Sequence, residues 1–342
     1  MPPIGRKQAI LELTMHRLQC GECENLWWPR LPFTKGTVRY TRSFALTVLD
    51  MLRFGTIKSV AQYLHVGWDT VKNIHKEKLT SVYREIDLKK VEYLGTDEFS
   101  IRKGHTYMTI FIDLQTGRVL HAVEGTGIDD PAPFLQTPAK NIHNIKAVSM
   151  DMSSGFISSF KKYLPDVPVI SDRYHITAQM SRAIDSLRRE QFNLLDTAGR
   201  KPLKGSRFLL LRNFHSLTEK KRCGLEKLPE VNRPLFIMHT MKEQLRLFRQ
   251  QRIGETAAAF LKQWCFDALM SDIKQLASIG AVILRHWNGL LNYYPHRISN
   301  GPLEGLNNKI KTMKRQAYGF RDMQYFKLRL YDTHASKYSF AG

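Results

Sequence analysis

Three acidic residues, far apart along the chain, each stand where a carboxylate could reach a metal ion. Asp97 ends a short apolar run, Asp151 directly follows a second one, and Glu304 lies at the start of a basic helical segment near the C-terminus. Carboxylate oxygens are hard ligands of the kind that Mg²⁺ prefers. Two divalent ions about 4 Å apart can activate an attacking hydroxyl and stabilise the leaving oxygen of a phosphodiester. The pattern predicts metal-dependent cutting and joining of phosphodiesters.

Each acid also has a simpler interpretation when it is taken alone. An aspartate after a strand is most often a turn residue, and Glu304 suits the positive end of its helix. Three carboxylates on adjacent elements, however, would repel one another by roughly 4 kcal/mol per pair at about 4 Å and an effective dielectric of ~20. Such an arrangement needs a compensating cation, which favours a metal site.

Neighbouring acids compete with this set or extend it. Glu98 should point to the opposite face of its strand from Asp97, because strand side chains alternate. Asp113 precedes a turn signal, and we expect it to cap that turn. Asp172 ends another apolar run shortly before His175. It could be a fourth acid, could orient His175, or could form an ion pair with the arginine that follows it.

The composition favours a polyanionic partner. The chain has 342 residues, 43% of them hydrophobic, and a net charge of +21 that is spread along the whole length. The length allows about two or three domains. The charge indicates nucleic acid held along an extended surface, although a basic protein that is merely soluble would have it too.

The cysteines and the hydropathy bear on the compartment. Four cysteines are too few for a disulfide scaffold, so we expect a reducing compartment. The N-terminus lacks a long apolar segment, and charges interrupt every apolar stretch before it reaches membrane-spanning length. We therefore expect a cytoplasmic protein with no membrane partner.

Residues 1–38 are expected to be irregular. They contain one Cys-x-x-Cys pair, Cys20 and Cys23. A structural zinc site needs four ligands, and Cys223 and Cys265 are not spaced as a second pair. We therefore expect two free thiols in a small apolar turn here, rather than zinc.

Residues 39–88 have helical periodicity. One apolar stripe is followed by Thr56, which can cap a second helix, and a short turn at 65–67 precedes a third helix over 68–79. Two short helices joined in this way form the helix-turn-helix pattern, whose second helix enters the major groove. An ordinary helical hairpin with a solvated polar face would have the same pattern. The outward residues suited to DNA contact are Thr70, Lys72, Asn73 and Lys76.

Residues 89–175 change to strand periodicity. Three runs rich in β-branched and aromatic residues, separated at hairpin-like distances, predict an antiparallel meander. These runs are 93–100, 105–114 and 117–124. Two short apolar runs, 145–150 and 167–171, flank a predicted helix, as in parallel strands with a helical crossover. This is the element order of the ribonuclease H-like fold, in which the first and fourth strands are neighbours and would bring Asp97 and Asp151 to one edge.

The rest of the chain is expected to be mostly helical. Apolar residues recur at helical spacing in 176–295, and 296–342 hold the Glu304 helix and an aromatic, basic tail. A Gly-Pro pair sets the start of that helix. Residues three and four apart share a helix face. Glu304 is therefore joined on its face by an amide and cations that suit a DNA backbone, namely Asn308, Lys311 and Arg315.

Several motifs and their order resemble those of one family. These motifs are Val66–Lys72, Thr96–His105, Asp151–Ser153, Asp172–His175 and Asn300–Lys311. Over about residues 17–335 the chain is similar to the DDE transposases of bacterial insertion sequences in the ISL-three family. Members of that family usually carry an N-terminal zinc ribbon with two Cys-x-x-Cys pairs, of which this chain has one.

The resemblance implies a fold and a metal site. The fold is an α/β ribonuclease H-like core with a mixed sheet, interrupted by a large helical insertion and preceded by an all-α helix-turn-helix domain. Asp97, Asp151 and Glu304 would be the catalytic triad that holds two Mg²⁺ or Mn²⁺ ions, with Asp172 and His175 as auxiliary groups. The implied domains are a zinc-ribbon remnant, the helix-turn-helix, the first part of the core, the insertion, and the C-terminal helix and tail, over 1–38, 39–88, 89–175, 176–295 and 296–342.

The resemblance also implies an activity. We expect a bacterial, nucleoid-associated transposase that binds terminal inverted repeats, cuts double-stranded DNA with Mg²⁺ and joins the 3′-hydroxyl to target DNA, acting as a homo-oligomer on DNA. Two other hypotheses stay open. One is a catalytically inactive DNA-binding regulator derived from such an enzyme, which the missing half of the ribbon suggests. The other is a structure-selective nuclease of the same fold.

Overall fold

The computed structural model describes residues 1–5, 7–35, 38–102, 106–127, 129–136, 144–197, 200, 203–204, 206–226 and 228–334. The chain forms two compact units. The terminal unit comprises Met1–Asp87, Arg118–Ala122 and Gly305–Gly342, and the central unit comprises Leu88–Gly117 and Val123–Glu304. Among the described residues, no helix combines the length and the apolar character needed to cross a membrane.

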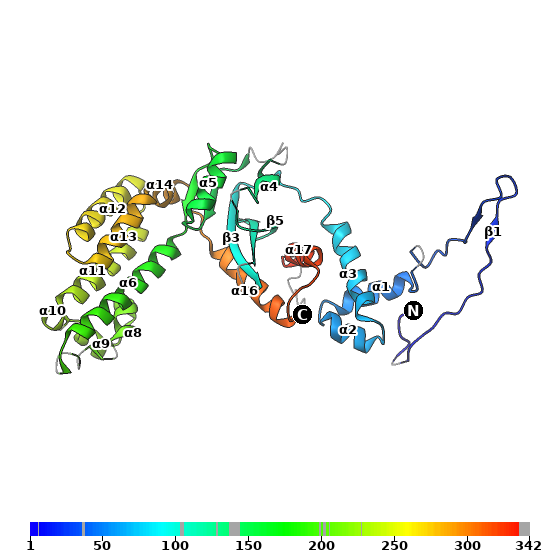
Figure 1. Ribbon diagram of the computed structural model, residues 1–342, viewed down its shortest axis with the longest axis horizontal. Coiled ribbons are helices and arrows are strands. Elements are labelled where there is room, and N and C mark those ends of the chain that lie inside the picture. The colour runs from blue at the N-terminus through cyan, green and yellow to red at the C-terminus, as the bar shows by residue number, and fades with distance from the viewer. Residues whose placement is uncertain are drawn as a thin grey trace. The chain divides into compact units, whose positions relative to one another are not determined.

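The terminal unit is built on three short helices, α1 (Arg42–Met51), α2 (Ile57–Tyr63) and α3 (Trp68–Val82) (Figure 1). Thr56 caps α2, because its hydroxyl oxygen accepts from the N–H of Ser59 at 3.2 Å, as the sequence predicts. The three helices share one apolar core, formed by Phe44, Val48, Val60, Ala61, Leu64, Val71 and Ile74. This core fixes the angle at which α3 leaves the turn after α2.

A small hairpin precedes these helices. Strands β1 (Leu18–Gln19) and β2 (Leu26–Trp27) pair antiparallel, and Cys20 and Cys23 lie in the turn between them. Both thiols are free. Backbone hydrogen bonds at Cys23 and Glu22 lower the pKa of the Cys20 thiol.

Helix α17 (Met323–Asp332) packs on α3, although the two are about 250 positions apart in sequence. The Nδ1 of His75 and the hydroxyl of Tyr325 are 2.8 Å apart in this contact. Lys76 Nζ donates to both carboxylate oxygens of Asp322 at 2.9 and 3.1 Å. Helix α17, near the C-terminus, therefore covers part of α3.

The central unit contains most of a five-stranded mixed sheet in the order β5-β4-β3-β6-β7. The strands are β3 (Tyr93–Arg102), β4 (Thr106–Asp113), β5 (Val119–Glu124), β6 (Ala147–Met150) and β7 (Val169–Ser171). Strand β3 pairs antiparallel with β4 and parallel with β6, and β6 pairs parallel with β7. Each predicted strand is present, although the predicted start of β4 at His105 lies outside the described residues.

Aromatic packing places two helices on one face of this sheet. The ring of Phe111 stacks on Phe134 of α4 (Ala132–Gln136) with centroids 4.7 Å apart, and it lies 6.3 Å from the ring of Phe160 in α5 (Ser154–Tyr163). Phe111 pairs with Thr96, so the two side chains share this face. Asp97, the next residue, therefore belongs to the other face.

After β7 the chain forms a helical bundle, as the apolar spacing predicts (Figure 1). Its helices are α6 (Arg173–Leu194), α8 (Arg207–Leu211), α9 (Glu219–Glu226), α10 (Leu228–Val231), α11 (Arg233–Gln250), α12 (Gly254–Leu269), α13 (Lys274–Arg285), α14 (Trp287–Leu291) and α15 (Tyr293–His296). Buried positions recur every three or four residues along α6, at Ile176, Met180, Ile184 and Leu187. Trp264 is the largest fully buried side chain among the described residues, and its indole N–H donates to the carbonyl of Met241 at 2.9 Å. The chain then enters α16 (Gly301–Gln316), whose start at the Gly-Pro pair confirms the prediction.

The bundle is attached to the sheet at β7. The side-chain amide of Asn292 donates to the carbonyl of Val169 at 2.9 Å. A Cβ added at Gly289 in α14 would lie 2.2 Å from Ser171 Oγ and 3.3 Å from its backbone nitrogen. Ser171 is buried, so the absence of a side chain at Gly289 lets α14 approach the strand end that precedes Asp172.

We expect Gly289→Ala to destabilise the protein by about 1–3 kcal/mol, because the new methyl overpacks the contact between α14 and β7. Thermal unfolding measures the loss. Gly305→Ala is the matched control, since Gly305 is also helical and its Cβ would meet nothing within 4 Å. A Gly289→Ala protein that unfolds at the wild-type temperature would contradict the close approach.

The burial of His75 makes the stability depend on pH. Burial, aided by the positive charge of Arg329, lowers the pKa of His75 from 6.5 to about 4. The folded ring thus stays neutral while the unfolded chain takes up a proton, so stability present above pH 6.5 is lost as the pH falls toward 4. The loss from this group is at most roughly 3 kcal/mol.

We expect His75→Gln, which can still reach the tyrosine hydroxyl, to flatten this acid-side loss of stability. Urea unfolding followed at several pH values below neutral measures it. The control is His16→Gln, at an exposed position in the same unit. An equally steep acid-side loss in the His75 variant would show that another group carries the dependence.

Candidate active site

Strand register brings three aspartates into one row. Gly95 of β3 is the partner of Ser149 in β6, and Ser149 is the partner of Ile170 in β7. Counting two residues onward along each parallel strand gives Asp97, Asp151 and Asp172. Asp97 lies inside β3, whereas Asp151 and Asp172 directly follow the last residues of β6 and β7. Continuing the two-residue alternation past those strand ends assigns the three carboxylates to one face. The register confirms that the strands carrying Asp97 and Asp151 are neighbours. Asp97 is nevertheless outside the group of described residues whose ligand atoms lie within 4.8 Å of one another.

Asp172 and His175 join Asp151 in a compact group. One ligand atom from each of the three lies within 4.8 Å of the others. His175 Nε2 lies 2.5 Å from Asp151 Oδ1. Asp172 also caps α6, since its carboxylate accepts from the N–H of Tyr174 at 3.0 Å. The end of β6 positions Asp151, the end of β7 positions Asp172, and the first turn of α6 positions His175.

The electrostatics of the group are those of crowded negative charge. The hydrogen bond to Asp151 raises the pKa of His175, and the charges of Asp151, Asp172 and Asp97 raise it further against the effect of burial. Burial raises the pKa of Glu98, and the charges of Asp151 and Asp97 add to this. The site therefore favours a cation, whether a proton on His175 or a metal ion.

Glu98 is a further acid beside this group. Side-chain alternation assigns it to the opposite face from Asp97, yet the negative charges of Asp97 and Asp151 still act on its carboxyl group. The Asp97 carboxylate accepts from the backbone N–H of Glu98 at 2.8 Å. In the sequence, only the position of Glu98 next to Asp97 indicates that it lies near the site.

Glu304 lies in the first turn of α16 and is exposed. It is not part of the group formed by Asp151, Asp172 and His175 among the described residues. Its N–H donates to the carbonyl of Asn300 at 3.1 Å, which continues the helix start. The other predicted contacts of this helix, Asn308, Lys311 and Arg315, are likewise exposed.

The predicted DNA-contacting residues of α3 differ in their surroundings. Asn73 is exposed and Thr70 is half-buried. Lys72 Nζ lies 3.2 Å from an Asp69 carboxylate oxygen and 5.1 Å from the Trp68 ring centroid. The Lys72 side chain is only 17% exposed. Lys76, the other predicted lysine contact to DNA, forms an ion pair with Asp322.

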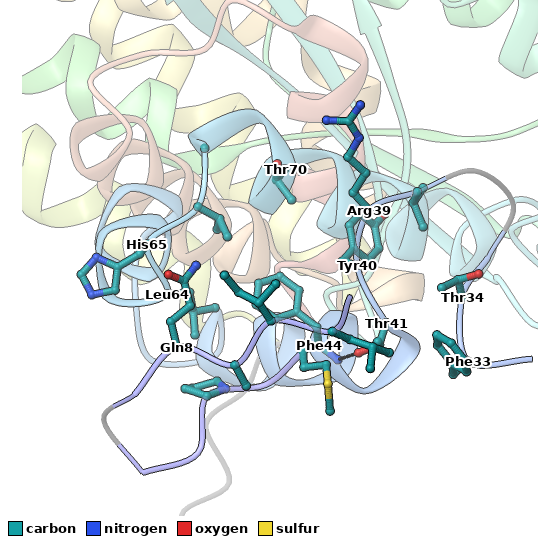
Figure 2. A pocket seen from close by; sticks show the side chains of 18 of the residues that line it. Gln8, Phe33, Thr34, Arg39, Tyr40, Thr41, Phe44, Leu64, His65 and Thr70 are labelled. Carbon is teal, nitrogen blue, oxygen red and sulfur yellow. Dashed lines mark hydrogen bonds between the residues drawn. The ribbon is translucent and has the colours of Figure 1, made fainter. Parts of the chain in front are cut away.

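A cavity of about 1390 Å³ lies at the N-terminal end of α3. Figure 2 shows Tyr40 and Phe44, at the entry to α1, gathered with Leu64 and Thr70 around it. Residues 1–13 contribute further lining side chains, Gln8 among them. The N-terminal segment therefore lies beside the helix end that reads bases in a helix-turn-helix.

Comparison with known proteins agrees with this arrangement. The family model described as a transposase matches residues 94–330, and that of the helix-turn-helix domain of transposase family ISL3 matches residues 29–77. The transposase for insertion sequence element IS1001 of Bordetella parapertussis is 32% identical over 333 residues, which are 96% of this chain and 82% of that protein. Transposases for element IS1557 of Mycobacterium tuberculosis are 25% identical over 345 residues, 94% of this chain and 77% of theirs. The chain belongs to the ISL3 family of insertion-sequence transposases, with a helix-turn-helix domain followed by a DDE transposase domain.

Proposed function

We propose that this transposase binds the terminal inverted repeats of its insertion sequence and catalyses metal-dependent DNA cleavage and strand transfer. The triad is Asp97, Asp151 and Glu304. The observation that carries the proposal is the register of β3, β6 and β7, which aligns Asp97 and Asp151 on one face. The crowded negative charge around Asp151 supports the proposal, because it favours binding of a metal cation there.

The fold that we assign to the core is ribonuclease H-like. The sheet order β5-β4-β3-β6-β7, with an antiparallel hairpin followed by parallel strands, supports it. The bundle between β7 and α16 is then the helical insertion. The proposed domains keep the predicted bounds, 1–38, 39–88, 89–175, 176–295 and 296–342.

The donors fit a divalent cation. Asp151, Asp172 and His175 present two carboxylates and an imidazole within 4.8 Å of one another, and Mn²⁺ accepts both kinds of ligand while Mg²⁺ prefers the oxygens. Asp97, Asp151 and Glu304 would hold the ions, with Asp172 and His175 as auxiliary groups. Two Mg²⁺ or Mn²⁺ ions held there would supply activation of the attacking hydroxyl and relief of charge on the leaving oxygen. His175 itself holds the Asp151 carboxylate in place through their 2.5 Å contact.

The chain's own basic and amide groups would hold the DNA. Asn73 and Thr70 on α3 would reach base edges, while Lys72 and Lys76 would contact phosphates. Both lysines now have carboxylate partners, but partly exposed ion pairs contribute only about 0–1 kcal/mol, so a DNA phosphate can compete for them. On α16 the contacts would be Asn308, Lys311 and Arg315. Paired inverted repeats favour a homo-oligomer on the DNA, by analogy with symmetric half-sites.

We expect Asp97→Asn, Asp151→Asn and Glu304→Gln each to lower strand transfer by roughly a thousandfold, since each weakens several kcal/mol of charge stabilisation. The assay uses the purified full chain, Mg²⁺ and DNA that carries the element ends. Asp166→Asn is the matched control, because Asp166 is exposed and precedes the start of β7, whereas Asp172 follows its end.

Wild-type rates from Asp97→Asn or Asp151→Asn protein would refute the assignment. Specific binding without nicking by the wild-type chain would instead identify a non-catalytic regulator. Cutting of branched DNA with no preference for the ends would identify a structure-selective nuclease.

Metal binding can be tested without catalysis. We expect Mn²⁺ binding to the DNA-free chain, followed by calorimetry, to weaken at least about tenfold in Asp151→Asn protein, because losing even a group that supports a metal ligand typically costs about 10- to 100-fold in metal affinity. The Asp166→Asn control should bind as the wild type does. Unchanged Mn²⁺ affinity in the Asp151 variant would place the ion elsewhere.

A further inference from the structure

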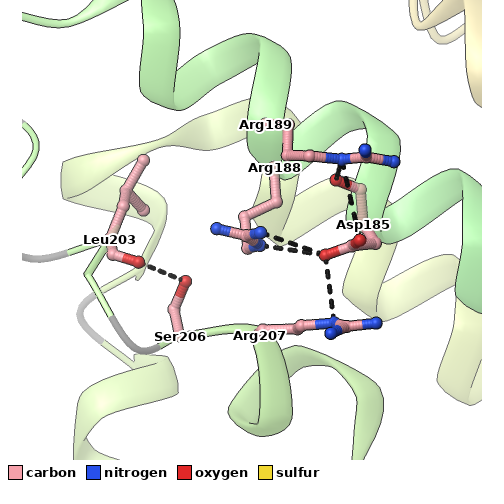
Figure 3. A network of polar contacts seen from close by, with 6 residues as sticks. All are labelled: Asp185, Arg188, Arg189, Leu203, Ser206 and Arg207. Carbon is pink, nitrogen blue, oxygen red and sulfur yellow. Dashed lines mark hydrogen bonds and ion pairs between the residues drawn. The ribbon is translucent and has the colours of Figure 1, made fainter.

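A second charged cluster lies on α6, about three turns beyond His175. Its centre is Asp185, which three arginines surround (Figure 3). Arg188 donates to Asp185 Oδ1 through Nε and Nη2 at 3.2 and 3.1 Å. Arg189 Nε lies 3.6 Å from Oδ2, and Arg207 Nε, contributed by α8, lies 3.3 Å from Oδ1.

A structural ion pair explains only part of this cluster. The side chains of Asp185 and Arg188 are both 18% exposed, so these two form the inner pair. Arg189 and Arg207 are 67% and 54% exposed. One carboxylate facing three guanidinium groups leaves a surplus charge of +2, and like charges held close together repel. A pair that served only to join α8 to α6 would not need the third arginine.

The surrounding sequence increases the surplus of positive charge around this cluster. Residues 182–212 contain eight lysines and arginines against three aspartates and glutamates, hence a local net charge of +5. Phe208, beside Arg207, is 69% exposed, and its ring centroid lies 5.9 Å from the guanidinium of Arg207. Exposed aromatic rings beside basic side chains suit the sugars and bases of nucleic acid.

The geometry leaves the outer guanidinium groups ready for an anion. Arg189 Nε is held by the carboxylate and also donates to the Asp185 backbone carbonyl at 3.3 Å. Figure 3 shows Arg189 and Arg207 on two sides of Asp185, each meeting it through Nε. The planar guanidinium fork binds phosphate oxygens through two parallel hydrogen bonds. A side chain that is already held loses less conformational entropy when a ligand binds.

We propose that Arg189 and Arg207, held by Asp185, form a phosphate clamp on the bundle that grips the backbone of the DNA substrate. This inference rests on the proposed function, because it takes DNA as the partner. Backbone contacts position DNA without reading its sequence. The clamp therefore strengthens binding to any duplex.

The test is the salt dependence of DNA binding by the full chain. The probe is a fluorescent duplex of random sequence, titrated between about 50 and 200 mM salt. Each phosphate contact contributes about 0.9 to the slope of log affinity against log salt concentration. We expect the Arg189→Gln/Arg207→Gln double variant to lose about 2 from the magnitude of the slope and to bind roughly 10- to 100-fold more weakly at the lower salt.

The matched control removes the same charge from other helices of the bundle. Lys262 on α12 and Arg285 on α13 are both exposed. Lys262→Gln/Arg285→Gln protein should keep the wild-type slope to within about half a unit. If the double clamp variant folds poorly by thermal melting, the two single variants replace it, and each should lose about 1 from the slope.

An unchanged salt slope in the clamp variant, or an equal loss of slope in the control variant, would overturn the proposal of a phosphate clamp. The outcome is separable from that of the proposed function. Wild-type protein that transfers strands, with no slope change in the clamp variant, would leave the function standing and remove the clamp. If the clamp variant loses the salt slope but the wild-type protein never nicks DNA, the clamp stands and the enzymatic assignment is removed.

Discussion

The backbone ladder of three parallel strands decides where the acidic side chains of this transposase meet. Gly95, Ser149 and Ile170 are successive partners across β3, β6 and β7, and the aspartates follow two residues later on each strand. A slip of one residue in either pairing would turn a carboxylate to the opposite face of the sheet. The register is protected because both faces of these strands carry buried residues, from Leu94 and Thr96 to Val148 and Ile170.

Crowded carboxylates raise the free energy of the folded state, and the fold offsets this locally. His175 supplies a hydrogen bond to Asp151, and α6 places it there because Asp172 directly follows β7 and caps the helix. The helix N-terminus adds a partial positive charge beside the carboxylates. Packing of Gly289 against Ser171 fixes the strand end from which both Asp172 and α6 start. One strand end thus controls the ligand set and the direction of the first bundle helix.

Helix α6 gives the central unit a rigid connection between two kinds of charge. It is 22 residues long, with His175 of the acidic group in its first turn and the Asp185 cluster further along. The first group is an excess of negative charge that suits metal ions, and the second is an excess of positive charge that suits phosphates. In the proposed function both would act on one DNA molecule, and a stiff helix would keep their separation constant.

Local sequence patterns were enough to predict most of the strands, helices and caps of this protein. Alternating and helical periodicities located the strands and helices, and short-range hydrogen bonds explain why Thr56 caps α2 and Asp113 caps the turn after β4, where its carboxylate accepts from Gln115 at 3.0 Å. The sequence by itself also contained the order of elements, from which the meeting of Asp97 and Asp151 could be expected, because parallel neighbours end at the same edge.

Only the tertiary structure decided which side chains share a site. The link between Lys76 and Asp322 joins residues 246 positions apart, and the pairing of Arg207 with Asp185 joins separate helices. The grouping of Asp172 and His175 with Asp151 depends on the angle at which α6 leaves β7. Periodicity reports which face of an element is buried but not which distant element covers it. That choice is made by packing over the whole chain, so the Lys76–Asp322 and Arg207–Asp185 pairs carried no signal in the sequence.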